Sequence, residues 1–408
     1  MRVSLACLLL ILSLSGSMVL AQDDPELTET PEPSINITIW WPDSFARVNE
    51  SDINPILMDQ SAEFADLYPN VVFEHRLKAV GQPGGIMSTL RSASRAAPDV
   101  LPTLTLVRRQ DLIFARAAGY LQSLEGFSSV IQSDLNNSLQ LGQFEDGLFG
   151  VPYLLELQHM VYRPTDGVDY SSWTFDAVLE RGEPFAFAGS RSNSLNDVVA
   201  LQYIEGGGIS SRDHTLTLDQ SSLTNIFEFY ESARDQEILS DIVTTYTNST
   251  VYEQSFIDGD INAAIFSSTR YLNLYHEDDS LAMATIPSET GDPISFMNAW
   301  MWVMVTQEGD EQAIALNYLN WMFDADRQAE LAEDVLMLPS REAAFEIGLA
   351  NNVPAAPYQQ LVENALIPLT EGEIGNIGRE MQTQFTNIFT SDASAVSALQ
   401  AVLDVVSE

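Results

Sequence analysis

The sequence predicts an α/β protein with two lobes, and three observations support this prediction. The chain has 408 residues, 45% of them apolar, which is enough for more than one core because a domain usually holds about 100 to 200 residues. Strand and helix patterns alternate along most of the chain. The first three patterned segments run strand, helix, strand, which implies a right-handed crossover and a mostly parallel sheet flanked by helices in each lobe.

The N-terminus predicts a signal peptide over residues 1–21. Arg2 precedes the apolar run LACLLLILSLSG, and a small-residue site ends at Ala21, so we expect cleavage there and export. The one cysteine, Cys7, lies in this segment, so the mature chain has no disulfides; lipidation at Cys7 is the less favoured alternative. Residues 22–34 are acidic and proline-rich and predict a disordered tether. No later apolar run reaches the roughly 20 residues that a membrane span needs.

The elements follow from the spacing of apolar residues. Ile35, Ile37 and Ile39 alternate with polar residues, which is typical of a strand, and Pro42 ends the segment. Pro69 likewise ends the first helix. The same reasoning predicts helices at 55–68, 86–97, 110–118, 173–181, 196–203, 223–235 and 251–259, strands at 71–79, 99–107, 149–163, 184–189 and 261–268, and an almost wholly helical chain from about 311.

Charge and motifs exclude several classes of function. The 58 acidic residues outnumber 18 basic ones, and loss of Arg2 with the signal peptide leaves 17 − 58 = −41, so nucleic acid and anionic membranes are poor partners. The four histidines lack metal-ligand spacing, and no phosphate-binding glycine loop is present, so we expect neither a metal nor a cofactor. Paired carboxylates for glycoside hydrolysis stay open as an alternative, because many acidic pairs exist.

Aromatic residues suggest a ligand site. Trp40 and Trp41 stand at the carboxyl end of the first strand, where open parallel sheets bind ligands. Neighbours in a strand point to opposite faces, so at most one of the two is expected to be purely a core residue. A tryptophan ring can lie flat on a sugar while the Asp43 carboxylate accepts hydroxyl hydrogens, although an organic cation would suit the same groups.

Several segments, in order, resemble the family-1 extracellular solute-binding proteins of ABC importers, the maltose-binding-protein-like type. They cover nearly all of the chain after the tether. The passages are ITIWWPDSF, DLIFARAAGYLQSLEG, FGVPYLLELQHMVYR, SWTFDAVLE, FIDGDINAAIF and YLNWMFDADRQAELAEDVLMLPSREAA. Arg163 replaces the asparagine usual in this family, and Asn298-Ala299 replaces a Gly-Gly before Trp300, which leaves the backbone geometry there open.

The resemblance implies a periplasmic-binding-protein fold with the ligand cleft between the lobes. Lobe 1 would comprise 35–155 and 285–325, and lobe 2 would comprise 156–284 and the helical segment 326–408. The implied function is a monomeric receptor that closes around a small solute, first of all a neutral sugar or oligosaccharide, and delivers it to an ABC importer permease without catalysis. The alternatives are a secreted glycoside hydrolase, a receptor for a polyamine or polyol phosphate, and an adhesion or scaffold module.

The resemblance also implies cleft residues at matching positions. Glu156 lies where the chain first crosses between lobes, with a salt bridge that supports the hinge as its alternative role. Asn193 and Asn196 precede a helix that they could simply cap. The full set is Trp40, Trp41, Asp43, Ser44, Arg108, Arg109, Glu156, Asn193, Asn196, Arg270, Tyr271 and Trp300.

Overall fold

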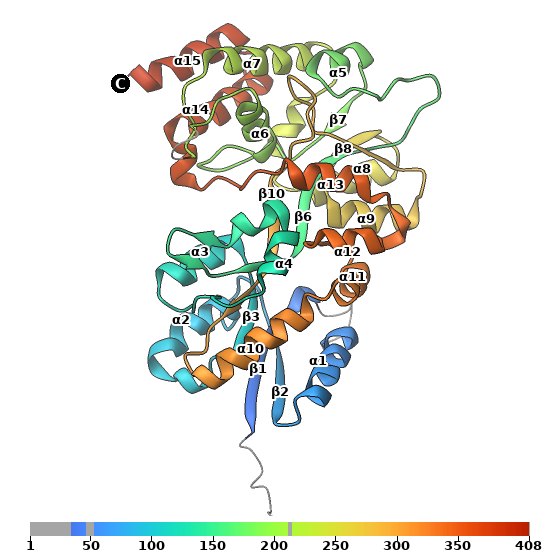
Figure 1. Ribbon diagram of the computed structural model, residues 1–408. Helices are drawn as coiled ribbons and strands as arrows, with labels where there is room; N and C mark the ends of the chain where they lie inside the picture. Colours follow the sequence, from blue (N-terminus) through green and yellow to red (C-terminus); the bar gives the residue numbers. More distant parts are fainter. Residues whose placement is uncertain (1–33, 46–52, 211–213, 408) are drawn as a thin grey trace, which may run out of the picture.

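The structure is a computed structural model that describes residues 34–45, 53–210 and 214–407, and it consists of two lobes joined at a narrow middle (Figure 1). The predicted signal peptide and all but the last residue of the tether lie outside the described residues. One mixed sheet runs through both lobes in the strand order β2-β1-β3-β10-β6-β8-β7. Helices flank it on both sides, so the predicted two-lobed α/β fold class is confirmed.

The lower lobe of Figure 1 is built on three parallel strands. In β1 the side chains of Ile37 and Ile39 are fully buried, as their period-two spacing predicts. Helix α1 begins where Asn54 Oδ1 accepts a hydrogen bond from the amide of Ile56, at 3.0 Å. The elements here are β1 (Ile35–Pro42), α1 (Pro55–Leu67), β2 (Val71–Lys78), α2 (Ile86–Ala96), β3 (Leu104–Arg108), α3 (Arg109–Ala117), α4 (Ser129–Asp134), β4 (Gln143–Phe144), β5 (Gly147–Leu148), β10 (Met297–Met304), α10 (Gly309–Met322), α11 (Ala325–Asp334) and β11 (Leu338–Pro339).

The upper lobe holds the short parallel pair β7 and β8 under a layer of helices. Thr174 and Asn196 cap α5 and α6 through their side-chain oxygens, and most residues of α6 are buried. The elements of this lobe and its border are α5 (Phe175–Arg181), β7 (Phe185–Ala186), α6 (Asp197–Glu205), α7 (Gln220–Asp235), α8 (Glu253–Ile257), β8 (Ala263–Ser267), α9 (Ser268–Glu277), β9 (Ala282–Ala284), α12 (Glu342–Ile347), α13 (Ala355–Glu363), α14 (Glu371–Thr390) and α15 (Ala395–Ser407).

The long strand β6 (Val151–Tyr162) runs from the lower lobe into the upper lobe. Its first half pairs with β10 and β11, and its second half pairs with β8 and β9. Every one of these pairings is antiparallel, so the expectation of mostly parallel sheets holds only for β1-β2-β3 and for β7-β8. The physical reason is that β6 and β10 carry the chain out of one lobe and back, which reverses its direction.

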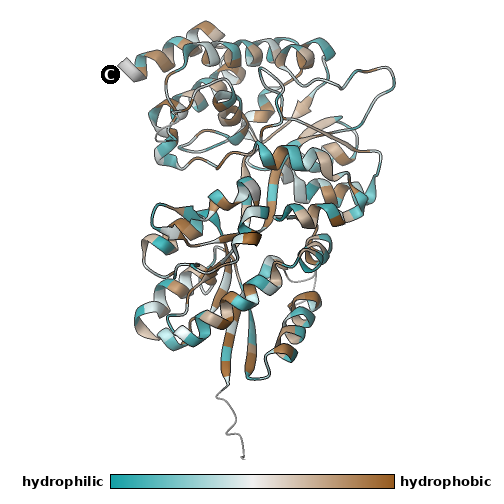
Figure 2. Cartoon of the chain, in the orientation of Figure 1, coloured by the Kyte–Doolittle hydropathy of each residue, from teal (hydrophilic) through white to brown (hydrophobic). Residues whose placement is uncertain are grey.

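The hydrophobic cores of the two lobes indicate where the chain leaves the upper lobe, returns to the lower lobe and leaves it again. Hydrophobic residues line the strands and the inward helix faces of each lobe, with hydrophilic residues outside (Figure 2). Ile286, Ile294 and Phe296 belong to the core of the upper lobe, whereas Leu331 and Met337 belong to the core of the lower lobe. We therefore propose that the chain returns to the lower lobe over about 297–337, whereas the sequence predicted 285–325.

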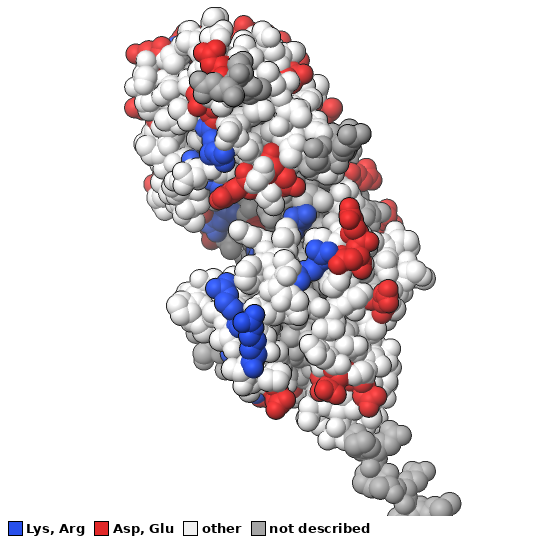
Figure 3. All heavy atoms as spheres, turned by 90° about the vertical axis from the view of Figure 1, so that its left-hand side faces the viewer, with Lys and Arg blue, Asp and Glu red and all other residues white. Residues whose placement is uncertain are grey.

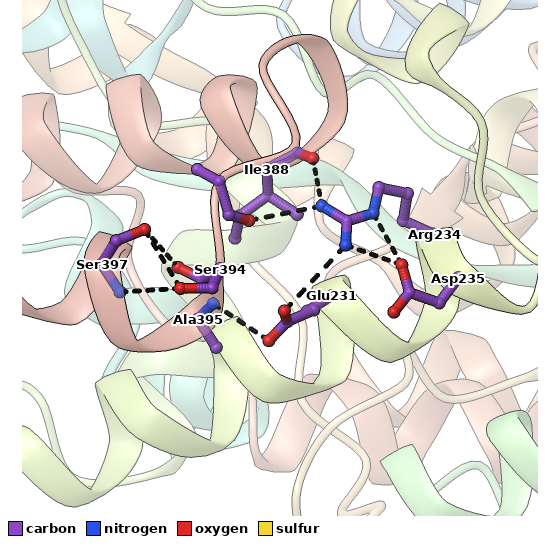
Figure 4. Close-up of polar contacts among 8 residues, drawn as sticks. Glu231, Arg234, Asp235, Ile388, Ser394, Ala395 and Ser397 are labelled. Carbon is purple, nitrogen blue, oxygen red and sulfur yellow. Dashed lines mark hydrogen bonds and ion pairs between the residues drawn. The ribbon is translucent and has the colours of Figure 1, made fainter.

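Helices α7, α14 and α15 are held together by a polar brace centred on Arg234 (Figure 4). Arg234 Nη1 donates to the carbonyl oxygens of Ile388, at 2.8 Å, and Ala393, at 3.3 Å. The Glu231 carboxylate accepts a hydrogen bond from the amide of Ala395, at 3.0 Å, where α15 begins. The brace thus satisfies backbone groups at the end of α14 and at the start of α15. No helix in the described part of the chain is both long and apolar enough to cross a bilayer.

We expect Arg234→Met to lower the free energy of unfolding by about 2 kcal/mol, because it removes two hydrogen bonds from a charged donor and keeps the apolar stem. Urea unfolding at neutral pH measures this change. Arg76→Met is the matched control, since Arg76 pairs only with Glu74 on the surface, and we expect it to cost less than about 1 kcal/mol. Equal effects of the two substitutions would show that the brace adds nothing specific.

Candidate functional site

Three of the predicted residues meet where the lobes join. Arg108 ends β3, directly opposite Trp300 on the neighbouring strand β10. Its guanidinium lies over the Trp300 ring at 4.3 Å and forms an ion pair with Glu156 on β6, with Nη1 to Oε2 at 3.3 Å. Burial lowers the pKa of Arg108, while the Glu156 charge opposes that change. The Arg108 and Glu156 side chains keep 32% and 25% of their surface exposed, so a solute can still reach them.

From Arg108 and Glu156, polar side chains continue along β6 into the upper lobe and form what we call the polar row. Gln158 lies two residues after Glu156 and therefore on the same face of the strand. Its side chain is hydrogen-bonded to Asp197 at the start of α6; burial raises the pKa of Asp197, while the nearby Arg191 and this hydrogen bond oppose the rise. Gln158, Asp197 and Arg191 line one hollow of about 250 Å³ beside the hinge strand. The row thus crosses from one lobe to the other.

A second cavity, of about 350 Å³, lies between the lobes. Its lower wall includes Arg109 and Asn137, and its upper wall includes the 363–369 loop and Glu373. The Asn137 amide bridges the lobes by donating to the carbonyl oxygen of Ala365, at 2.6 Å. Burial lowers the pKa of Arg109, and its Nε is buried with no hydrogen-bond partner among the described residues. Figure 3 shows the hollow between the lobes, with basic side chains above and below it.

The structure places both tryptophans of the first strand in the core, against the prediction that one of them faces a ligand. Trp40 and Trp41 are each 1% exposed. Trp41 packs edge-on against Trp302 and donates its indole N–H to His75 Nδ1, at 2.9 Å, while Lys78 covers Trp40. Both faces of this central strand are covered by other elements, so alternation leaves neither ring open.

The residues after β1 lie beside the Arg108 site. Asp43 and Ser44 are exposed in the short 3-10 turn Asp43–Phe45. Phe45 from the same turn packs against Trp300, with ring centroids 5.4 Å apart, and so places the turn next to the stacked guanidinium. Trp300 is itself 4% exposed, so its neighbours cover most of the ring.

The two asparagines take different roles. Asn196 is buried and caps α6 by accepting from the Val199 amide, at 3.0 Å, which is the alternative foreseen for it. Asn193 is exposed, has φ of 59°, and lines an upper-lobe hollow together with Arg191. Asparagine tolerates this left-handed backbone better than most residues.

Arg270 and Tyr271 do not join this group. Arg270 is engaged by Glu253, with Nε to Oε2 at 2.6 Å. Tyr271 is 2% exposed and packs edge-on against His159, which points to the face of β6 opposite Glu156 and Gln158. These two residues therefore serve packing behind the hinge strand.

Sequence reasoning missed Gln158, Asp197 and Arg191, and also Arg379 on α14, which lines the same upper-lobe hollow as Arg191 and Asn193. Gln158 could have been found, because a strand that presents Glu156 to a cleft presents residue 158 to the same side. Arg191, Asp197 and Arg379 come from a loop and two helices whose meeting depends on the tertiary fold, and no local pattern signals it. No group of three or more potential metal ligands occurs within the described residues.

Comparison with known proteins decides the family. A profile described as bacterial extracellular solute-binding protein matches residues 62–360, well over half of the chain. The chain belongs to the bacterial extracellular solute-binding proteins. The resemblance to extracellular solute-binding proteins noted in the sequence is thus confirmed. An extracellular family is also consistent with the predicted export of the chain. No curated protein sequence matches it.

Solved structures share the fold at low identity. Maltose-bound MalE3 of T. maritima superposes with a TM-score of 0.66 at 14% identity, over 91% of this chain and 99% of that one. The cyclic alpha-maltosyl-1,6-maltose binding protein of Arthrobacter globiformis gives 0.68 at 14%, over 91% and 98%. The GacH receptor of Streptomyces glaucescens, solved unliganded and with acarbose, gives 0.64 at 14%, over 92% and 98%. At this identity the likeness establishes the fold of the binding protein and not its ligand.

Proposed function

We propose that this binding protein captures a small, hydroxyl-rich solute of the sugar type by closure of its lobes and delivers it to the permease of an ABC importer. The observation that carries the proposal is the polar row from Arg108 through Glu156 and Gln158 to Asp197, which crosses the junction of the lobes along β6. Because the row has partners in both lobes, a solute bound to it gains contacts when they close, and such differential affinity is what shifts a hinge equilibrium.

Two further points support a sugar. Similar structures are those of proteins that bind maltose and acarbose. The side chains around the hinge offer carboxylate, amide and guanidinium groups, which pair with hydroxyls. Trp40 and Trp41 are buried and cannot stack on a sugar ring, so they give no support for a neutral sugar. Whether the solute is charged has to be inferred from other residues.

The proposal describes a receptor that works as a monomer and makes or breaks no bond, with ATP hydrolysed by a separate partner. In the structure Glu156 faces the Arg108 guanidinium, and Asp197 is hydrogen-bonded to Gln158. We propose solute binding rather than the paired-carboxylate chemistry of glycoside hydrolysis, and recovery of unchanged sugars tests this choice.

A thermal-shift screen of the purified protein against sugars and oligosaccharides, polyamines and polyol phosphates tests the receptor. We expect one solute class to raise the midpoint, since a ligand at a hundredfold excess over its Kd stabilises the folded state by about 2.7 kcal/mol. Sugars incubated with the protein should be recovered unchanged. Turnover of an oligosaccharide would move the assignment to a hydrolase, and a flat response to every class would contradict a solute receptor of this specificity.

A further inference from the structure

We propose that the solute carries a carboxylate or phosphate group, which binds between Arg191 and Arg379 on the upper wall of the site. This inference names the solute class of the proposed receptor and rests on that proposal for its place in the function. Its evidence is a hollow of about 400 Å³ between the 191–194 loop and α14. Two guanidinium groups line this hollow together with the amides and hydroxyls of Asn193, Gln382, Thr383 and Asn387, and none of the described lining residues is acidic.

The absence of acidic groups is notable in a chain with 58 acidic residues. Among the described residues, carboxylates lie within 4.0 Å of most arginines, and those ion pairs leave little charge for a ligand. The arginines paired in this way are Arg76, Arg108, Arg116, Arg163, Arg234, Arg270, Arg327 and Arg341.

Arg191 and Arg379 form no such ion pair within the described part of the chain, which is also true of Arg91, Arg95, Arg109 and Arg181, but Arg191 and Arg379 alone among these line one hollow together. Arg379 Nη2 donates only to the side-chain oxygen of Asn376, which is neutral. Asp197 is near enough to Arg191 to feel its charge, yet its hydrogen bond goes to Gln158. Both arginines are exposed and keep most of their donors for a ligand.

A buried network fixes the backbone positions from which the two arginines extend. Gln382 lies on α14, one turn after Arg379, and its amide donates to the carbonyl oxygen of Gly189, at 2.8 Å. Its oxygen accepts from the backbone and side-chain nitrogens of Asn196, at 2.9 and 3.0 Å. The loop that carries Arg191 is thereby held against α14 at both its ends. Two guanidinium groups that line one hollow suit an oxyanion, whose oxygens accept forked hydrogen bonds.

The proposed anion site adjoins the polar row along β6. Arg191 lines both this hollow and the one that holds Gln158 and Asp197. Figure 3 shows basic side chains above and below the hollow with acidic ones beside them. Because the net charge of the chain is −40, attraction of an anion would depend on the arginine pair itself and not on the overall field.

Inorganic phosphate, added at constant ionic strength, probes the arginine pair directly. We expect it to raise the thermal midpoint of the wild-type protein and of Arg76→Gln, a control that removes the same charge at a distance. In Arg379→Gln and Arg191→Gln we expect roughly ten- to hundredfold weaker phosphate binding, because each loses a charge-assisted hydrogen-bonding group. Glucuronate and glucose 6-phosphate, compared with glucose, then show whether the group is a carboxylate or a phosphate.

An equal phosphate response in all four proteins, or none in the wild type, overturns the inference. A retained response to an uncharged sugar in Arg379→Gln, with no phosphate effect, would overturn it and leave the receptor proposal intact. A phosphate response that depends on the arginines, without any response in the sugar screen, would support the anion site and contradict the sugar-receptor proposal.

Discussion

Replacement of Glu156 with alanine is expected to abolish solute binding and to lower the free energy of unfolding by about 2 kcal/mol. The carboxylate is the counter-charge of Arg108, whose guanidinium is pressed against Trp300 and only partly exposed to water. Its removal leaves a desolvated cation unpaired, which costs more than loss of a surface ion pair. Urea unfolding measures the lower free energy of unfolding. Thermal shift with the solute class that stabilises the wild type measures the loss of binding.

A double variant separates the two roles. Arg108→Met with Glu156→Leu replaces the pair by apolar groups of similar size, which often restores stability to within about 1 kcal/mol of the wild type. We expect this variant to fold but not to bind solute. As the matched control, the same kind of double substitution is made at the ion pair of Arg163 and Asp278, whose charged atoms lie 3.5 Å apart and outside the polar row along β6. We expect the control variant to keep solute binding. Solute binding that survives in the double variant would remove Arg108 and Glu156 from the site.

The fold could be predicted from the sequence where apolar periodicity coincides with burial. The helix predicted at 55–68 is α1 (Pro55–Leu67), whose buried positions follow the helical period. The strand predicted at 35–41 is β1, whose buried positions alternate as far as Ile39 and are then continuous through Pro42. The strand predicted at 99–107 is shorter, since Pro98–Val100 forms a 3-10 turn and β3 starts only at Leu104. Local turn chemistry decided that boundary, which apolar content alone could not show.

The candidate site was predictable only in part. Glu156 interrupts an apolar strand and so stands out, and Arg108 ends a buried strand. Trp41 lies in an equally suggestive place yet is a core residue, because Trp302 and His75 cover it from other strands. Whether a large aromatic residue faces a cleft or a core depends on what the distant parts of the chain place over it. Arg191 and Arg379, in contrast, line one hollow although they lie 188 positions apart, and no sequence pattern indicated that they would meet.

Acidification is expected to destabilise the protein between pH 6.5 and about pH 4 through two histidines that fold in the neutral state. His159 is fully buried, with its ring nitrogens bonded to the Met160 carbonyl oxygen, at 3.0 Å, and the Tyr358 hydroxyl, at 2.9 Å, and burial lowers its pKa to about 4. His75 accepts the indole N–H of Trp41 at Nδ1, so protonation there would break that bond, and burial likewise lowers the pKa of His75 to about 4.

The direction of the effect follows from proton binding. The folded pKa of His159 lies below the unfolded value of 6.5, so the unfolded chain binds more protons between these values. This contribution to stability is therefore fully present above pH 6.5 and is lost as the pH falls to about 4, where it has cost about 3 kcal/mol. Carboxylates whose pKa is lowered by hydrogen bonds, such as Asp219, lose their contribution only below the ordinary range for aspartate.

Urea unfolding at pH 7.5, 6.0 and 5.0 measures this slope. In His159→Gln we expect a lower stability at pH 7.5 but a clearly flatter decline, because glutamine cannot take up the proton. His276→Gln, at an exposed position on α9, controls for the substitution itself. An unchanged decline in His159→Gln would assign the acid sensitivity to other groups. A flatter one would assign part of the acid sensitivity to His159, which meets Tyr271 and Tyr358 on the face of β6 behind the proposed solute site.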